Sequence, residues 1–558
     1  MELLDCRRLT GPNVVWDKPG AVIDIACDDA EAGDAIAGLA DILEPLLAAL
    51  GWRNESLAAR KCIGGFSLAL SAPMDALYAA TEILEAAWNL HGDCDDSLED
   101  KLVGVRSAIA EESKAALTEL LRQADRHQTA WLLDDDVVSL GLGRHAKSWP
   151  VRALPGTAAL RWESFNSIPV GLITGTNGKT TTSRLVANMV AAGGRISGLT
   201  STDWMAVGGA IIDEGDYAGP GGARTVLRDQ RVDVAVLETA RGGLLRRGLA
   251  VRRADAALIT NISEDHLGDF GSRSLEELLE IKWTVTRALS GDKPLILNAD
   301  DAMLVARAQN TDARIVFFSP DADNKILAQH LSAGGDACSV VDGALARGAN
   351  GEWHAIMPAE EPPITFSGAA RHNIANALGA IAMAHALGVP DEAIARGLRQ
   401  TQRGDNPGRC NLYEVDGIKV LVDFAHNVDA MRALFQLARK LPAKRRLLCF
   451  GQAGDRPDAS IAELAQSAWQ IGLDLVVISE LEKYYRGREP NEVYAIMAKA
   501  LREAGADASQ IAHSEDEMAA LRLALQEARP GDLVIMLALA ASTEIRAWLK
   551  DKEQHDAG

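Results

Sequence analysis

A glycine turn that ends in Lys-Thr carries the clearest chemistry in this sequence. Residues 175–182 read Gly-Thr-Asn-Gly-Lys-Thr-Thr-Thr and directly follow a short apolar run at 170–174. Apolar residues then recur at helical spacing until Gly193-Gly194, which predicts a strand, a glycine turn and a helix. Such a turn binds anions, because its main-chain N–H groups and the helix N-terminus both face the phosphate oxygens.

The same turn supplies two side chains suited to a nucleotide. Lys179 adds a positive charge for the phosphates, and the Thr180 hydroxyl is a ligand for Mg²⁺. Ile173 stands where the general phosphate-loop pattern has its first glycine, so an ordinary glycine turn with a surface lysine is the alternative. The predicted nucleotide-binding residues of the turn are Gly175, Thr176, Asn177, Gly178, Lys179, Thr180 and Thr181.

Reactive side chains also follow two further apolar runs. The apolar run 232–237 is followed by Glu238, and the run 256–259 is followed by Asn261 and then His266. Ligands of open α/β sheets collect beyond the carboxyl ends of the strands, so we expect these side chains near Lys179. A single Glu or His usually has a structural role, but their convergence favours a magnesium site formed by Thr180, Glu238 and His266.

Three stretches of different texture must position these residues. Residues 1–165 mix short strands with alanine-rich amphipathic helices, and residues 166–405 repeat a strand, loop and helix order. Residues 406–558 repeat that order, with strands expected at 419–424, 446–450, 473–479 and 533–537. The sequence therefore predicts an α/β protein. It would have a smaller α+β N-terminal domain, a central phosphate-loop domain with a parallel sheet, and a Rossmann-like C-terminal α/β domain.

Two segments are expected to lack regular structure. The turn-rich residues 404–408, Gly-Asp-Asn-Pro-Gly, suit an interdomain linker. The polar residues 321–352 are expected to form surface hairpins and loops of the central domain.

Composition excludes several classes of function. The net charge of −21 argues against a nucleic-acid partner, because phosphate backbones are held by clustered Lys and Arg. The first residues do not read as a basic segment followed by an apolar one, so no secretory signal is expected. The apolar run 533–541 is shorter than the roughly 18–20 residues of a membrane span. Seven scattered cysteines without a C-x-x-C pair indicate reduced thiols, which favours a cytoplasmic protein. The sequence leaves the oligomeric state open, including a homo-oligomer.

The order of these motifs resembles that of the Mur ligases and folylpolyglutamate synthetases. Besides the glycine turn, the match rests on Leu-Glu-Thr at 237–239, Thr-Asn-Ile-Ser-Glu-Asp-His at 260–266, His-Asn-Ile-Ala-Asn at 372–376, Pro-Gly-Arg at 407–409 and Asp-Phe-Ala-His-Asn at 423–427. The resemblance extends from about residue 168 to the end of the chain. It implies an ADP-forming ligase that uses ATP and Mg²⁺ to join a carboxylate substrate, a small molecule or a peptide, to an amino-acid amine.

The resemblance also implies a role for each matched residue. The catalytic residues would be Lys179, Glu238, His266 and Lys282, with Lys282 carbamylated. The remaining nucleotide-site residues would be Asn261, Asn373 and Asn376, together with Arg409, Asp423 and His426 of the C-terminal domain. Asp423 and His426 would position either the nucleotide or the incoming amine.

Residues 215–227 and 238–249 resemble the Mur-like half of the cyanophycin synthetases, and residues 9–14 and 138–143 resemble the N-terminal domain of those enzymes. The chain departs from their pattern because the Mur-like core follows soon after residue 143, without the ATP-grasp domain that they carry between the two regions. The resemblance implies amide formation between an aspartate side chain and arginine. Arg241, Arg246 and Arg247 are either ligands of an acidic acceptor or surface residues.

Two other functions remain compatible with the sequence. One is a non-catalytic chain that holds nucleotide or polymer as the partner of a complete synthetase, although the full catalytic set argues against it. The other is a kinase or ATPase that stops at the phosphoryl product, although the two downstream motifs favour ligation. Phosphate release that depends on both an acid and an amine would discriminate among the three.

Overall fold

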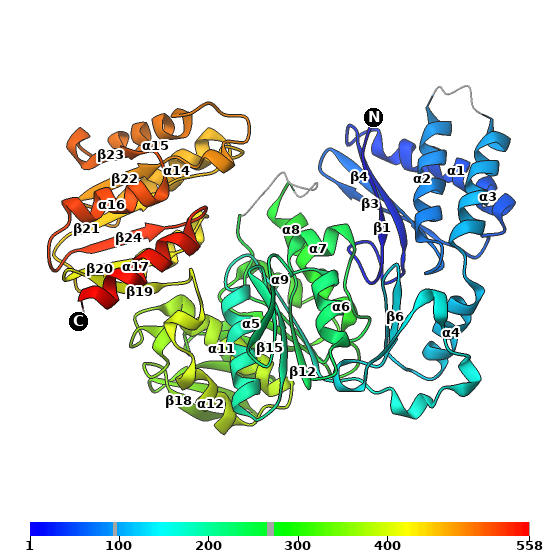
Figure 1. Ribbon diagram of the computed structural model, residues 1–558, viewed down its shortest axis with the longest axis horizontal. Helices are drawn as coiled ribbons and strands as arrows, with labels where there is room; N and C mark the ends of the chain where they lie inside the picture. Colours follow the sequence, from blue (N-terminus) through cyan, green and yellow to red (C-terminus); the bar gives the residue numbers. More distant parts are fainter. Residues whose placement is uncertain (93–96, 265–272, 557–558) are drawn as a thin grey trace.

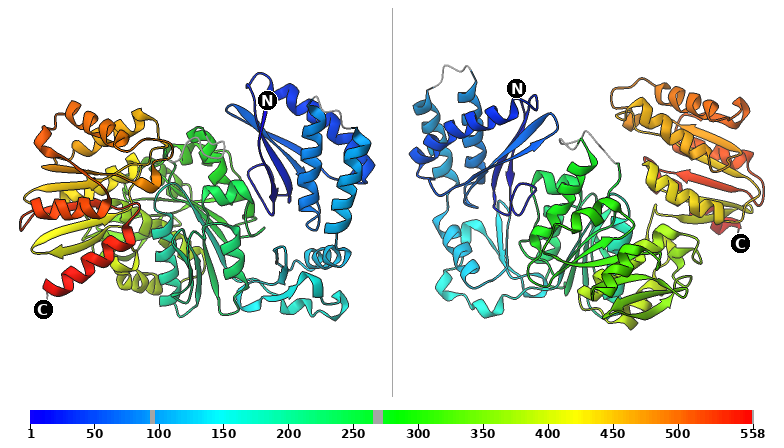
Figure 2. Two further views of the ribbon diagram at one scale, coloured as in Figure 1. Left: turned by 45° about the horizontal axis from the view of Figure 1, so that its top comes forward. Right: turned by 180° about the vertical axis from the view of Figure 1, so that it is seen from behind.

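The computed structural model describes residues 1–92, 97–264 and 273–556 and arranges them around three main sheets (Figure 1). The N-terminal elements and the C-terminal sheet lie on opposite sides of the central sheet, as the views from two further directions also show (Figure 2). In the described residues, no helix is long and apolar enough to cross a membrane.

The N-terminal part contains two antiparallel sheets. The first has the order β1-β2-β4-β3 and packs against three helices through a core that includes Leu39, Leu68 and Ile83. A three-stranded sheet, β5-β6-β7, and one further helix connect this part to the centre. The elements are β1 (Glu2–Leu9), β2 (Gly20–Ala26), α1 (Ala32–Leu50), β3 (Leu57–Cys62), β4 (Gly65–Ser71), α2 (Leu77–His91), α3 (Leu98–Glu112), α4 (Ala115–Arg126), β5 (Trp131–Leu133), β6 (Val137–Leu140) and β7 (Lys147–Pro150).

The central sheet has eleven strands in the described residues, in the order β11-β10-β9-β12-β8-β13-β14-β15-β16-β17-β18. The strands from β9 to β16 in this order run parallel, and antiparallel strands extend both edges. The strands are β8 (Val170–Thr174), β9 (Ser197–Thr200), β10 (Trp204–Val207), β11 (Ala210–Glu214), β12 (Val234–Glu238), β13 (Ala256–Ile259), β14 (Pro294–Asn298), β15 (Arg314–Ser319), β16 (Asp336–Val341), β17 (Ala344–Ala349) and β18 (Glu352–Pro358).

Helices cover both faces of the central sheet because its strands alternate buried side chains between two cores. Leu172 of β8 enters one core and its neighbour Ile173 enters the other. The helices on the Ile173 side are α5 (Lys179–Ala192), α11 (Arg371–Ala386) and α12 (Asp391–Gln400). Those on the Leu172 side are α6 (Pro220–Arg228), α7 (Arg241–Arg246), α8 (Leu275–Trp283), α9 (Ala302–Ala308) and α10 (Lys325–Ser332).

The expectation of hairpins and loops at residues 321–352 is largely wrong. A β16–β17 hairpin does occur there, but both strands belong to the main sheet and α10 precedes them. The Asp and Gly residues that give the region its polar texture lie mostly between these short elements, at 321–323, 334–335 and 342–343, and they hid the apolar residues within them. Leu327 and Leu331 bury one side of α10, and Cys338 and Leu345 anchor the strands beneath α11.

The C-terminal sheet has the order β19-β20-β24-β21-β22-β23 and is parallel except at β19. Helices cover both of its faces, which confirms the predicted α/β class. The elements are β19 (Asn411–Val415), β20 (Ile418–Asp423), α13 (Val428–Lys440), β21 (Arg446–Phe450), α14 (Asp458–Trp469), β22 (Leu475–Ser479), α15 (Glu492–Glu503), β23 (Ile511–Ser514), α16 (Glu517–Glu527), β24 (Leu533–Leu537) and α17 (Ser542–Asp556).

Candidate active site

A cavity of about 790 Å³ lies where the carboxyl ends of the central strands meet the C-terminal domain. The structure brings most of the predicted site residues to its wall: Thr176, Asn177, Gly178, Lys179, Thr180, Thr181, Glu238, Asn261, Lys282, Asn373, Asn376, Arg409, Asp423 and His426. Gly175 is not part of the wall, and His266 lies outside the described residues.

Strand register explains why the predicted residues of the central domain meet. In the parallel sheet Glu238 of β12 pairs with Ile173 of β8, and Ile259 of β13 pairs with Thr174. The glycine turn, Glu238 and the Thr260-Asn261 segment therefore leave the sheet at the same level. This is the rim where ligands of such sheets bind.

The glycine turn is shaped by its own glycines and by the tip of β13. Gly178 has a φ of +84°, and a Cβ added there would lie 2.2 Å from Asn376 Oδ1. The Thr260 hydroxyl and the Asn261 amide both donate to the Asn177 carbonyl, over 2.6 and 3.0 Å. The turn is thus held in a backbone conformation that residues with a side chain rarely adopt. Helix α5 begins directly after it, at Lys179.

Two lysines contact the glycine turn. Lys179 Nζ donates to the Thr176 carbonyl over 2.9 Å. Lys282 Nζ donates to the Gly175 carbonyl over 2.8 Å from α8, whose N-terminus is capped by Ser274. Lys282 is 4% exposed, so this helical lysine is turned into the site rather than toward solvent. Carbamylation of Lys282 stays a prediction.

Glu238 is a buried carboxylate at the end of β12. It is 1% exposed, and neither of its oxygens has a hydrogen-bond partner among the described residues. Burial raises the pKa of Glu238, against the opposing effects of the Lys179 charge and the nearby Thr180 hydroxyl. An isolated buried carboxylate is costly, and a bound cation would remove that cost.

The described residues of the cavity supply part of the ligand set of a magnesium ion. In the part of the chain that the structure describes, no three His, Cys, Asp or Glu side chains gather as a ready-made metal site. Mg²⁺ commonly takes one or two protein oxygens and completes its shell with phosphate and water. Glu238 and Thr180, both in the cavity wall, can supply those protein oxygens.

The two asparagines at the start of α11 differ in their surroundings. Asn373 is buried and its amide donates to the Ile364 carbonyl over 2.9 Å. Asn376 Nδ2 donates to Asn373 Oδ1 over 3.2 Å, while its own oxygen lies beside Gly178. Asn373 therefore orients Asn376 against the phosphate loop.

The C-terminal domain contributes Arg409, Asp423 and His426. The Arg409 guanidinium lies 4.8 Å from the centre of the Phe424 ring. The Asp423 carboxylate accepts the main-chain N–H groups of Cys410 and Ala425, over 2.7 and 2.8 Å, and His426 Nδ1 lies 3.0 Å from the Phe424 carbonyl. Asp423 therefore fixes the chain around Arg409 in addition to lining the cavity.

Sequence reasoning missed several polar residues of the same wall. Asp203 follows β9, and Asp300 and Asp301 follow β14. Their position just beyond a strand end is the same sequence signal that marks Glu238. Asn427 was missed as a domain contact: it exchanges two side-chain hydrogen bonds with Asn177 across the domain boundary.

The three arginines after Glu238 have different fates. Arg241, at the start of α7, lines the catalytic cavity. Arg247, which follows the last residue of α7, lines a separate cavity near the N-terminal elements, and Arg246 is in neither wall. The three arginines therefore do not share one role, and of the three Arg241 is the one placed to hold an acidic acceptor in the catalytic cavity.

Two family models match the chain. The Mur ligase middle domain matches residues 173–384, and the Mur ligase glutamate ligase domain matches residues 408–538. Cyanophycin synthetase of Trichormus variabilis is 35% identical over 387 residues, which is 69% of this chain and 42% of that protein. The chain thus spans less than half the length of that relative.

Other relatives match the same region over more of their own length. UDP-N-acetylmuramoyl-L-alanyl-D-glutamate–2,6-diaminopimelate ligase of Gloeobacter violaceus is 30% identical over 372 residues, covering 65% of this chain and 70% of that protein. Among solved structures, Mycobacterium tuberculosis folylpolyglutamate synthase complexed with ADP has a TM-score of 0.50 and 20% identity, covering 68% of this chain and 90% of that one. The last comparison concerns the fold alone.

Proposed function

Because the chain belongs to the Mur ligase family, we propose that it is an ATP-dependent ligase that forms an amide through an acyl phosphate. The relatives with matching cores are a synthetase and a ligase. The observation that carries the proposal is the buried Glu238 carboxylate, which accepts no hydrogen bond within the described ranges, in one cavity wall with the Lys179 phosphate loop.

The first step would be phosphoryl transfer. A carboxylate oxygen of the acceptor attacks the γ-phosphorus of ATP, the bond to the bridging oxygen breaks, and ADP leaves. The amides of residues 175–180 and the Lys179 ammonium would hold the β- and γ-phosphates, with Thr180 and Glu238 as ligands of magnesium. Magnesium, when bound, neutralises phosphate charge.

The second step would be attack of an amine on the acyl carbonyl, with phosphate as the leaving group. Lys282, whose Nζ donates to the Gly175 carbonyl, would lie near the bound magnesium. If it is modified, it would act there as a carbamate. His266 would ligate a second magnesium ion, as the family resemblance implies. Arg409 from the C-terminal domain would reach the phosphates, while Asp423 and His426 would orient nucleotide or amine.

Water must be excluded because an acyl phosphate hydrolyses readily. The C-terminal domain already contributes one side of the cavity, from Arg409 through Leu434. Asn376 beside Gly178, supported by Asn373, and Asn261 at the loop would complete the nucleotide side. Closure of the two domains over the nucleotide thus fits the chemistry.

For the substrates, we propose an acidic peptide acceptor and an amino-acid amine, with arginine joined to an aspartate side chain as the first pair to test. Arg241 in the cavity wall supports a negatively charged acceptor. The likeness to cyanophycin synthetase supports the aspartate and arginine pair.

The test is mass spectrometry of reactions containing ATP, Mg²⁺, aspartyl peptides and an amino-acid mixture. A mass gain of one amino acid less water, absent with Lys179→Ala, would support ligation and name the amine. A stable phosphorylated peptide would point to a kinase. Nucleotide binding without any product across the panel would favour a non-catalytic binding protein.

A further inference from the structure

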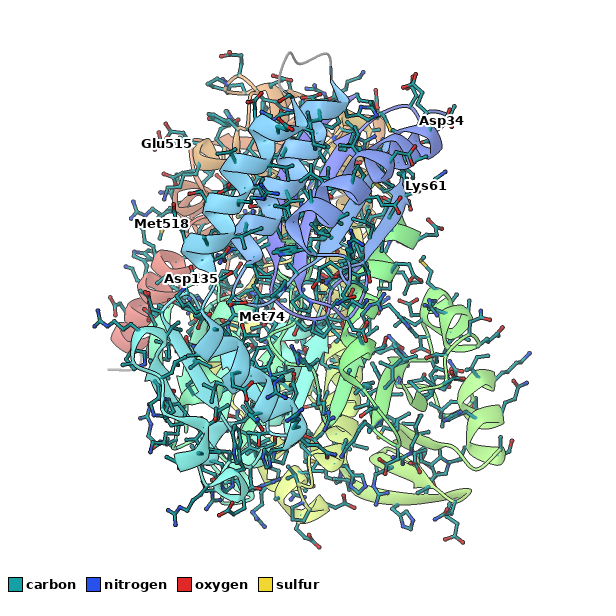
Figure 3. All side chains as sticks on the ribbon, turned by 90° about the vertical axis from the view of Figure 1, so that its right-hand side faces the viewer. Asp34, Lys61, Met74, Asp135, Glu515 and Met518 are labelled. Atoms are coloured by element: carbon teal, nitrogen blue, oxygen red, sulfur yellow. The ribbon has the colours of Figure 1, made fainter. Side chains whose placement is uncertain are left out.

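A second cavity, of about 400 Å³, lies at the junction of the N-terminal elements with α6 and α7. Figure 3 faces this junction, where Met74 and Asp135 are labelled between the N-terminal helices and the central part of the chain. Four cationic and four acidic side chains line it: Arg8, Lys114, Arg224, Arg247, Asp75, Glu112, Asp134 and Asp135. Its size falls in the range of small-molecule sites.

Half of these charges are matched within the wall. Arg8 pairs with Asp135 over 2.7 Å and stacks on the Tyr78 ring, 3.6 Å from its centre. Arg224 pairs with Asp134 over 2.6 Å. The first pair lies within the N-terminal elements, and the second joins them to α6.

Arg247 is a cation of the wall that forms no ion pair in the described residues, although the charge of Asp135 acts on it. In the described residues its guanidinium donates to two main-chain carbonyls, those of Arg8 and Arg246, over 3.2 and 3.4 Å. Burial lowers the pKa of Arg247, and the neighbouring Arg8 charge lowers it further. A half-buried guanidinium beside a second one is an arrangement that an anion would stabilise.

Asp75 is the complementary acid. It is buried, and across the described ranges its carboxylate accepts the main-chain N–H of Lys114, over 2.7 Å, without an ion pair to any cation. Glu112 differs, because both of its oxygens accept main-chain N–H groups in the first turn of α2, from Tyr78 and Ala79. Four charged side chains of the wall thus form no ion pair in the described residues: Arg247, Lys114, Asp75 and Glu112. Lys114 Nζ donates to the Glu112 main-chain carbonyl and the Glu112 oxygens are occupied, which leaves the Arg247 guanidinium and the Asp75 carboxylate as the pair to consider.

We propose that this junction cavity binds a free α-amino acid, whose carboxylate pairs with Arg247 and whose ammonium pairs with Asp75. A zwitterion satisfies both charges at once and adds no net charge to a wall that is already balanced. The site is separate from the catalytic cavity: α7 begins at Arg241 in the catalytic wall, and Arg247 follows its other end.

The test is calorimetric titration of the protein without ATP, using arginine, aspartate, lysine, glutamate and glycine in turn. At least one should bind, and its carboxamide and its N-acetyl derivative should each bind at least tenfold more weakly. Arg247→Gln and Asp75→Asn should weaken binding by a similar factor. Lys179→Ala should bind as the wild type does, because the phosphate loop lines the other cavity.

Arg144→Gln is the matched control, since Arg144 is an exposed arginine that pairs with Asp233 away from both cavities. The analogue series on the wild-type protein keeps the proposal falsifiable if Arg247→Gln or Asp75→Asn fails to fold. No binding across the five amino acids would overturn the proposal. Binding that survives both Arg247→Gln and Asp75→Asn would also overturn it, by assigning the amino acid to the catalytic cavity.

Discussion

The side-chain pair Asn177–Asn427 should couple nucleotide binding to the C-terminal domain. Asn177 Nδ2 donates to Asn427 Oδ1 over 3.2 Å, and Asn427 Nδ2 donates to Asn177 Oδ1 over 3.0 Å. Asn177 belongs to the phosphate loop, and Asn427 is the buried N-cap of α13. The pair therefore holds the C-terminal domain directly on the residues that would cradle phosphate.

The perturbation must remove this pair and keep the helix cap. Asn427→Ser retains a side-chain oxygen for the Ala430 N–H, which Asn427 Oδ1 now accepts, and Asn177→Ala removes the other partner. Two hydrogen bonds at about 0.5–1.5 kcal/mol each give a coupling of roughly 1–3 kcal/mol. That energy corresponds to about 5–150-fold in an equilibrium constant.

The assay is a double-mutant cycle on kcat/KM for ATP, measured as ADP release with the substrates found by mass spectrometry. Each single variant should lose kcat/KM by a factor within that range. The double variant should have a kcat/KM no lower than that of the less active single variant. Asn188→Ala, which loses one hydrogen bond from α5 to Thr401 at the end of α12, away from the cavity, should have little effect. Losses that simply multiply in the double variant would refute the coupling.

Three further outcomes are expected. Glu238→Gln should abolish turnover yet raise the apo melting temperature by about 2–4 °C per kcal/mol of relieved charge burial. Because burial raises the pKa of Glu238, wild-type stability relative to this variant should fall as pH rises above the usual carboxyl range, and equal pH profiles in thermal unfolding would contradict this. Gly178→Ala places a side chain at a φ of +84° against Asn376, so ADP titration should show weaker binding by about 1–3 kcal/mol, and unchanged affinity would exclude that strain. Protein exposed to ¹³C-bicarbonate should give a carbamate NMR signal that Lys282→Arg lacks, and its absence from the wild type would remove the carbamylation hypothesis.

Local patterns predicted two of the strands that carry the central part of the cavity wall. The strand at 170–174 and the apolar run at 256–259 match β8 and β13, because buried parallel strands are short apolar runs with glycine or polar residues at their ends. Lys282 was identified by resemblance alone, since helical spacing does not tell a buried lysine from an exposed one. The sequence equally could not show which cavity Arg247 lines, because this depends on where α7 ends.

Contacts between distant segments were beyond reach for a different reason. Asn177 and Asn427 are 250 residues apart, and no periodicity relates a phosphate loop to a helix cap in another domain. Asp423 could be placed at a strand end from the sequence. Its hydrogen bonds from the Cys410 and Ala425 amides could not be predicted, since they depend on how the linker approaches β20.

The linker between the two domains is more ordered than its turn-rich sequence indicates. Asn406 accepts a hydrogen bond from Arg184 Nη1 over 2.7 Å and donates to the Thr181 hydroxyl over 2.8 Å, so the first half of the linker is attached to α5. Asn411 then accepts the Gly408 N–H over 2.6 Å and donates to the Arg403 carbonyl over 2.7 Å. Since α5 also begins at Lys179, the helix that presents the phosphate loop fixes the chain just before Arg409. The position of the arginine from the C-terminal domain is therefore set by the same helix that begins at the phosphate loop, and the two cannot shift independently without breaking these bonds.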